Sequence, residues 1–225
     1  FMSVQTNDIG RYNISYMFGN VIQQIGIACG KAISPMLYSH FKNKNEIGPR
    51  KIIFSLQSFF LLMTFSVSIW LKELFSLLIK NENLSNMYML AIIIVMSYSY
   101  RPMYLGANTR LFYIEKTKVL LKISLVAGLA NVLMNLIFIP IYGFEIAAIT
   151  TYISLMYMGY SGYYLKVFKD NNNVNYYPLL WLLTTLILTI SAIYIVELDL
   201  IIKVLVNIIL AFVFFVFIKK NQNDV

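Results

Sequence analysis

The stretch that decides the fold reads Asn131-Val-Leu-Met-Asn135-Leu-Ile-Phe-Ile-Pro140-Ile-Tyr142-Gly143-Phe-Glu145-Ile-Ala147-Ala148-Ile-Thr-Thr151. One apolar run ends at Pro140 and Gly143, and a second begins only a few residues later. Proline and glycine both interrupt a continuous helix, so the chain is expected to reverse direction here. Two long apolar helices joined by so short a turn are typical of a polytopic membrane protein. Asn131 and Asn135 then need partners away from lipid.

The composition of the chain favours the same setting. Of its 225 residues, 59% are hydrophobic and 12% are charged, and the mean hydropathy is +0.70, well above that of a typical soluble domain. The single cysteine, Cys29, excludes an internal disulfide framework. The net charge of +8 is compatible with nucleic-acid binding, but the cations cluster between apolar runs, which indicates membrane orientation instead.

Apolar runs of about the ~20 residues that cross a bilayer as a helix recur along the chain. They cover residues 12–39, 52–71, 88–108, 119–139, 144–165, 177–196 and 200–218. The sequence therefore predicts an all-α, polytopic membrane helical bundle with about seven transmembrane helices. We expect residues 1–165 to form the core of this bundle and residues 166–225 to add two peripheral transmembrane helices and a short tail.

Lysine and arginine are distributed unequally between alternate connections. One set contains Lys42, Lys44, Arg50, Lys51, Arg110, Lys116, Lys118, Lys166, Lys169, Lys219 and Lys220. The other set contains only Arg11, Lys72, Lys80 and Lys203. The first set, and with it the C-terminus, is therefore expected in the cytoplasm. Residue 1 would lie outside with no signal segment before it, so we expect a fragment that lacks upstream helices.

Polar residues inside apolar spans are costly, so they mark where function is expected. One stripe on the first span contains Asn13, Asn20, Gln24 and Lys31, and a neighbouring stripe contains Gly19, Gly26 and Gly30. The third span carries Ser97, Arg101, Tyr104 and Asn108, and the fourth carries Ser124, Gly128, Asn131 and Asn135. Pro102 is expected to kink the third span. These patterns predict that the first four spans surround a polar cavity and that the last two face lipid.

Lys31 and Arg101 are expected at similar depths in the membrane. Lys31 lies about eight residues, or ~12 Å, from the cytoplasmic end of its span. Both long side chains could snorkel to the interface. We favour a shared cationic site for an anion such as phosphate, because both residues lie on polar stripes.

Other polar residues have simpler interpretations. Asn131 and Asn135 are interpreted as interhelical hydrogen-bonding residues, and His40 and Cys29 as structural. The ten acidic residues fall in connections or near span ends, so the chain offers no mid-membrane carboxylate for proton or sodium coupling. It also lacks a Walker loop, a metal-ligand cluster and a plausible catalytic triad, so neither an enzyme nor a cofactor is predicted.

Three motifs lie in the first part of the chain: Asp8-Ile9-Gly10-Arg11-Tyr12, Lys116-Thr117 and the 131–151 stretch. Together they resemble the C-terminal part of polysaccharide-repeat flippases of the multidrug/oligosaccharidyl-lipid/polysaccharide exporter superfamily. In these proteins a motif similar to the first one opens a helix. Within the third motif, Ile146 replaces the glycine of the family's Gly-Ala-Ala. The resemblance covers most of residues 1–165.

This resemblance implies about twelve to fourteen helices in two bundles around a central cavity, with this chain as the second half. Such proteins move undecaprenyl-diphosphate-linked oligosaccharide across the bacterial cytoplasmic (inner) membrane, for O-antigen lipopolysaccharide or capsule. Lys31 and Arg101 would then meet the diphosphate, while sugars or water would contact Asn20, Gln24, Tyr104 and Asn108. Structural roles, without substrate contact, would fall to Asp8, Gly10, Pro140 and Gly143. The implied partners are the lipid-linked oligosaccharide, membrane lipids and other glycan-assembly membrane proteins.

Three alternatives stay open from the sequence. A multidrug/cation antiporter of the same superfamily would need a membrane carboxylate outside this chain. A membrane glycan polymerase or acyltransferase would be expected to show a substantial extracytoplasmic loop or a buried His/Asp pair, and the chain has neither. An inactive remnant is the third alternative.

Overall fold

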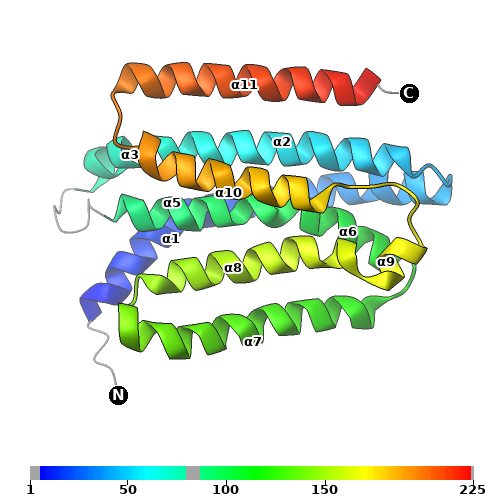
Figure 1. The fold of residues 1–225 in the computed structure, drawn as a ribbon, viewed down its shortest axis with the longest axis horizontal. Coiled ribbons are helices and arrows are strands. Elements are labelled where there is room, and N and C mark those ends of the chain that lie inside the picture. Colours follow the sequence, from blue (N-terminus) through cyan, green and yellow to red (C-terminus); the bar gives the residue numbers. More distant parts are fainter. Residues whose placement is uncertain (1–5, 80–86, 224–225) are drawn as a thin grey trace.

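A computed structural model describes residues 6–79 and 87–223, with side chains for residues 12–79 and 87–222. Over this part the chain is all-α and contains no strand. The long helices lie side by side and alternate in direction (Figure 1). They are α1 (Thr6–Lys42), α2 (Ile47–Ile69), α3 (Leu71–Leu78), α5 (Tyr88–Ser97), α6 (Arg101–Tyr113), α7 (Thr117–Tyr142), α8 (Ile146–Tyr160), α9 (Lys166–Asp170), α10 (Pro178–Ile195) and α11 (Leu200–Asn223), with 3-10 turns η1 (Tyr98–Tyr100) and η2 (Ser161–Tyr164).

Four of these helices, α2, α7, α10 and α11, are long and apolar enough to cross a membrane. The mean hydropathy of their most apolar windows runs from 1.9 to 2.9. They also expose large apolar side chains, such as Leu129 at 58% and Ile208 at 60%, which water would disfavour and lipid would accept. The chain thus has the features of a multi-pass membrane protein. The other spans expected from the sequence fall on α1, α5–α6 and α8.

The third expected span is divided in two. Helix α5 ends at Ser97, η1 follows, and α6 starts at Arg101 with Pro102 in its first turn. Proline is tolerated in a first turn because its missing N–H has no helical acceptor there. The predicted kink is confirmed as a break just before Pro102. The short helices α3 and α9 were not predicted from the sequence.

The reversal predicted after Pro140 is confirmed. Helix α7 continues through Pro140 to Tyr142, and α8 begins at Ile146. Gly143 between them has a φ of +83° with ψ near 180°, a conformation that essentially only glycine adopts without strain. The reversal therefore depends on Gly143 more than on the proline.

Helices α2 and α5 form the centre of the bundle. Phe60 and Phe65 of α2 and Ile92 and Met96 of α5 are at most 1% exposed. Helices α1, α8 and α10 pack against this pair, while α7 packs outside α8 and α11 packs outside α2 (Figure 1). This arrangement makes α7 and α11 the outermost helices.

The last two helices were expected to face lipid, and α10 does so on one side only: Leu183 and Ile187 are 47% and 62% exposed, while its other side is packed. Helix α10 packs against α2, α5 and α8, whereas in α7 and α11 alike only 11% of the most apolar window is buried. Tyr152 and Tyr160 of α8 form hydrogen bonds with Thr189 and Thr185 of α10, at 2.9 and 3.2 Å. These two threonines attach one face of α10 to α8, although its sequence otherwise matches a helix that faces lipid all round.

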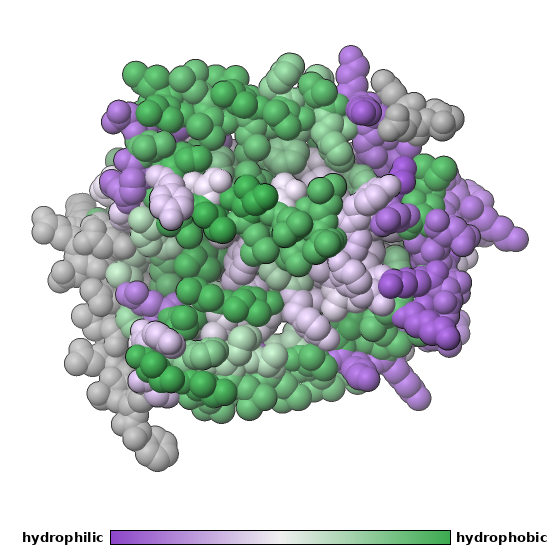
Figure 2. All heavy atoms as spheres, viewed as in Figure 1, coloured by the Kyte–Doolittle hydropathy of each residue, from purple (hydrophilic) through white to green (hydrophobic). Residues whose placement is uncertain are grey.

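The connections predicted to share the cytoplasmic side do share one end of the bundle. The α1–α2, α6–α7 and α8–α10 connections and the end of α11 lie together at the right of Figure 1. Hydrophilic residues gather at the same end (Figure 2). We call it the basic end, because it carries the larger set of lysines and arginines given above.

Candidate functional site

Helix α1 has one closely packed face and one open face. A Cβ atom at Gly19 would lie 2.6 Å from Ile94 Cγ2, and one at Gly26 would lie 3.0 Å from Arg101 Cδ. The predicted glycine face therefore packs directly on α5 and α6. The stripe formed by Asn13, Asn20, Gln24 and Lys31 is exposed throughout, and we call it the α1 polar face. The sequence predicted both faces correctly.

The polar residues of α6 lie beside the packed face of α1. The stem of Arg101 contacts Gly26, and its guanidinium lies 5.8 Å from the ring centroid of Tyr100. The ring of Tyr104 is 5.9 Å from that of Tyr100. Arg101 Nε and Asn108 Oδ1 are buried, and neither has a hydrogen-bond partner among the described residues. Buried polar atoms of this kind call for water or a ligand.

Lys31 and Arg101 do not form one closed cationic site. Both lie deep along their helices, roughly 16 Å from the end of α1 and roughly 18 Å from the end of α6 at 1.5 Å per residue. Lys31, however, leaves α1 about 140° around the helix axis from Gly26, which Arg101 contacts. Lys31 is exposed and Arg101 is half-buried. The two cations thus flank α1 at a common depth instead of converging.

The polar residues of α7 belong to a different surface. Asn131 Nδ2 donates to Thr151 Oγ1 at 3.3 Å, and Asn135 Nδ2 donates to Asn131 Oδ1 at 3.2 Å. Thr150 Oγ1 in turn donates to Asn135 Oδ1 at 2.5 Å. The interpretation of these asparagines as interhelical hydrogen-bonding residues is confirmed.

The prediction of one cavity surrounded by the first four spans was therefore wrong. The asparagines of α7 are directed at α8, its immediate neighbour in sequence. A methyl group added at Gly128, on the same stripe, would meet no described atom within 4 Å. The α1 polar face is turned away from the helices on which α1 packs. Periodicity identified each stripe, but it could not indicate which helix each stripe faces.

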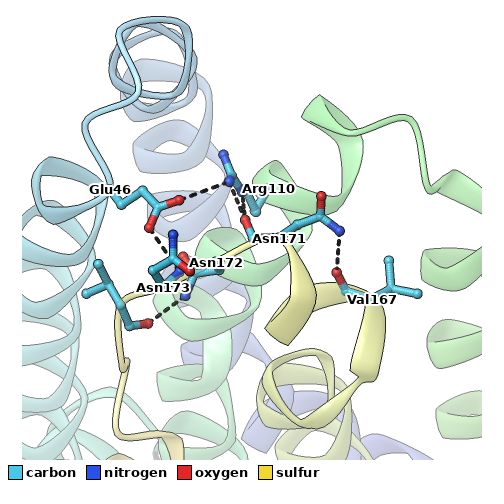
Figure 3. A network of polar contacts seen from close by, with 7 residues as sticks. Glu46, Arg110, Val167, Asn171, Asn172 and Asn173 are labelled. Atoms are coloured by element: carbon cyan, nitrogen blue, oxygen red, sulfur yellow. Dashed lines mark hydrogen bonds and ion pairs between the residues drawn. The ribbon is translucent and has the colours of Figure 1, made fainter.

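A polar network at the basic end was not predicted. Arg110 at the end of α6 donates from Nε to the carbonyl oxygen of Asn171 at 3.0 Å and pairs with Glu46 at 3.5 Å (Figure 3). The second carboxylate oxygen of Glu46 accepts the N–H of Asn173 at 2.9 Å. The guanidinium also lies 4.9 Å from the ring centroid of Phe41. Because Arg110 is fully engaged in joining three connections, we assign it an architectural role.

A second group of charges lies at the opposite end. Lys72 Nζ is 2.5 Å from Glu197 Oε2, and Tyr88 donates to Glu197 Oε1 at 2.6 Å. The hydrogen bond from Lys72, followed by that from Tyr88, lowers the pKa of the Glu197 carboxyl, and the same hydrogen bond to Glu197 raises the pKa of Lys72. Lys203 of α11 is fully buried against Glu73 at 2.5 Å. These contacts join α3 to α11 and join both α3 and α5 to the connection between α10 and α11.

Among the described residues, no group of three His, Cys, Asp or Glu side chains is placed to hold a metal ion. His40 packs against Gly48, where an added Cβ would lie 2.4 Å from His40 Nδ1, which agrees with a structural role. The Asp8 to Tyr12 motif lies in the first turns of α1, but the side chains of Asp8, Gly10 and Arg11 lie outside the described residues. No protein-family model, curated protein or solved structure matches the chain.

Proposed function

We propose that this chain is the second half of a two-bundle transporter that moves undecaprenyl-diphosphate-linked oligosaccharide across the bacterial cytoplasmic membrane. The observation that supports it most is the outward direction of the α1 polar face. Asn20, Gln24 and Lys31 are exposed on a helix whose opposite, glycine-containing face packs into a bundle of membrane-type helices.

Lipid is an unfavourable environment for that face. A lysine at the centre of a bilayer costs about 2.5–3.5 kcal/mol by insertion scales, and buried amides also require partners. The outward polar stripe is therefore expected to border another polypeptide or a water-filled space. A second helical bundle with an aqueous cavity between the two halves supplies both, which is the arrangement of alternating-access transporters.

The two cations suit an anionic substrate. The guanidinium of Arg101 can bind a phosphate through two parallel hydrogen bonds, and its Nε has no partner among the described residues. Because Lys31 and Arg101 lie at a common depth on different sides of α1, each would contact the diphosphate separately. Asn20, Gln24, Tyr104 and Asn108 would offer hydrogen bonds to sugars or water. No covalent step is required.

The orientation follows from the basic end. Its excess of lysine and arginine supports a cytoplasmic position by the positive-inside rule, which would place the C-terminus in the cytoplasm. Lys31 lies well inside α1 and Arg101 lies at the start of α6, both far from the basic end, so the substrate would reach them after entering from that side.

The proposal is tested by complementation of a flippase-deleted strain with the intact protein. Lys31→Met and Arg101→Met keep the apolar stems and remove the charges, so each is expected to reduce surface glycan at least tenfold at a normal level of membrane-inserted protein. Lys118→Met and Lys166→Met, exposed cations at the basic end, are the matched controls and should leave surface glycan unchanged.

Three results would contradict the proposal. Normal surface glycan from the Lys31→Met/Arg101→Met double variant would favour the snorkelling interpretation. Drug resistance conferred without any surface glycan would favour the multidrug/cation antiporter. Polymerised glycan built in a polymerase-deleted strain would favour a membrane glycan polymerase.

A further inference from the structure

A groove of about 790 Å³ opens at the basic end, between α1, α2 and the last turn of α11. Its apolar lining includes Ile33, Met36, Leu56 and Phe59. Met36 is 53% exposed and Phe59 is 48% exposed, so the groove is open to the surroundings of the protein. In a membrane protein, the surroundings of an apolar groove on the outside of the bundle are lipid.

The groove changes in polarity along its length. Helix α1 runs toward the basic end and α2 runs away from it, so Ile33 and Phe59 lie deep and His40, Asn45 and Lys51 lie at the end (Figure 1). Lys51 and Phe59 are separated by roughly 12 Å along α2 at 1.5 Å per residue. A phospholipid has the same order of polarity, with its charged headgroup at the interface and its acyl chains toward the middle of the bilayer.

At the polar end of the groove, Lys51 carries a positive charge that no acidic side chain of the described residues pairs with. Lys51 Nζ donates to the carbonyl oxygen of Gln222 at 2.9 Å, and that acceptor is neutral. None of the ion pairs formed among the described residues includes Lys51. Glu46, the carboxylate of the adjoining α1–α2 connection, is engaged by Arg110 and by the N–H of Asn173. A phosphate is therefore favoured at Lys51 by charge.

The wall of the groove beside Lys51 is held in place. His40 lies against the backbone of Gly48, where any side chain would collide with the imidazole, and both residues line the groove. Asn221 Nδ2 of α11 donates to the carbonyl oxygen of Lys51 at 3.2 Å. The polar end thus joins α1, α2 and α11, and a molecule bound there would contact all three helices.

We propose that this groove binds an anionic phospholipid, with its phosphate beside Lys51 and an acyl chain along Met36 and Phe59. The bound lipid would hold the end of α11 against α1 and α2. The site lies apart from Lys31 and Arg101, and the proposal depends only on insertion of the protein in a membrane, not on the identity of the transported substrate.

The test uses the intact protein purified in detergent, with lipid retention measured by native mass spectrometry and stability by thermal unfolding. The probes are phosphatidylglycerol and phosphatidylcholine with the same acyl chains. We expect phosphatidylglycerol to be retained at least tenfold better and to raise the unfolding temperature. Lys51→Met should remove this preference, whereas Lys118→Met, an exposed cation on α7 at the same end, should keep it.

A second variant tests the apolar part without changing the charge. Met36→Trp places a larger side chain in the groove and should reduce the retention of both lipids. The proposal is overturned if Lys51→Met and Lys118→Met behave alike, if both lipids bind wild-type protein equally, or if Met36→Trp retains them fully. A dimer through this face, or retention of a polyprenyl diphosphate in preference to phosphatidylglycerol, would also overturn it.

Discussion

Two polar stripes of this molecule have nearly the same sequence pattern and opposite environments. On α7, Asn131 and Asn135 find partners on the next helix, and their hydrogen bonds join α7 to α8. On α1, Asn20, Gln24 and Lys31 are exposed, while the glycine face of the same helix packs on α5 and α6. The first stripe joins two helices of the bundle. The second stripe is open to contact with water, a ligand or another part of the protein.

The difference shows what a polar residue in a membrane helix requires. Each such residue needs a polar partner, which is supplied either by a neighbouring helix or by water, ligand or a further bundle. A short turn such as the one at Gly143 supplies the neighbouring helix automatically, because it returns the chain antiparallel to itself. Helix α1 has no such hairpin partner on its polar side among the described residues. An open stripe is therefore the better indicator of function.

The largest expected effect on stability distinguishes the packed face of α1 from the open side of α7. Gly19→Ala would bring a methyl group into contact with Ile94 and Tyr98, which are 1% and 5% exposed and have little room to move. Overpacking of this kind costs about 1–3 kcal/mol. Gly128→Ala meets no described atom within 4 Å and, because alanine favours a helix over glycine, should raise the free energy of unfolding by about 0.5–1 kcal/mol. Reversible unfolding in detergent measures both, and equal effects would contradict the assigned packing.

A smaller effect is expected from the hydrogen bonds between α7 and α8. Asn135→Ala removes the interhelical acceptor of Thr150 and, within α7, the donor to Asn131. Interhelical hydrogen bonds in membranes average about 0.6 kcal/mol each. The variant should therefore lose about 1 kcal/mol of stability. In double-mutant cycles, Asn135→Ala should couple with Thr150→Val but not with Gln24→Ala, because Gln24 lies on a different surface. Coupling energies of equal size in both cycles would contradict the assignment of the two stripes to different surfaces.

The smallest effect concerns the exposed pair at the opposite end. The pKa of Glu197 is lowered in the folded protein, so its contribution to stability is present above the unfolded value of ~4.3 and is lost as the pH falls through the folded value. The pKa of Lys72 is raised, so its contribution is present below the unfolded value of ~10.4 and is lost as the pH rises through the folded one. Both groups are exposed, so each effect is small.

A pH series of unfolding experiments measures this pair. Glu197→Gln should flatten the decrease in stability between about pH 5 and pH 3 relative to wild type, and should have less effect near neutral pH. Asn135→Ala, which removes no titrating group, should shift the whole profile without changing its shape. An acid-side profile that is unchanged by Glu197→Gln would show that the contact with Lys72 does not form in solution.

The sequence predicted where the helices lie along the chain better than which helices pack against one another. Long apolar runs and the Pro140–Gly143 turn located α7 and α8, because helix length and chain reversal are local properties. The close contacts of α1 were signalled by Gly19, which permits the approach of α5, and by Gly26, which permits the approach of α6. The packed face of α10 was not predicted, because two threonines that form hydrogen bonds with tyrosines of α8 do not alter its apolar pattern.

The candidate site was predicted in part for the same reason. The spacing of Asn20, Gln24 and Lys31 placed them correctly on one face of α1. The sequence led us to expect Lys31 and Arg101 in one shared site, but they lie on different sides of α1. Periodicity could not show this, because it does not indicate which side of α1 packs against α6. The Arg110–Glu46 network was missed, since it joins three connections that are distant in sequence, and only tertiary structure brings them together.

The central claim is that the α1 polar face borders water, whereas the asparagine stripe of α7 is closed by α8. It is tested most directly by the rate at which a charged, membrane-impermeant thiol reagent modifies single cysteines in lipid nanodiscs, in a Cys29→Ala background of the intact protein. Modification requires a water-exposed thiolate. We predict that Gln24→Cys reacts at least tenfold faster than Asn131→Cys and than the lipid-facing Ile208→Cys. A Gln24→Cys variant as unreactive as Ile208→Cys would contradict the account.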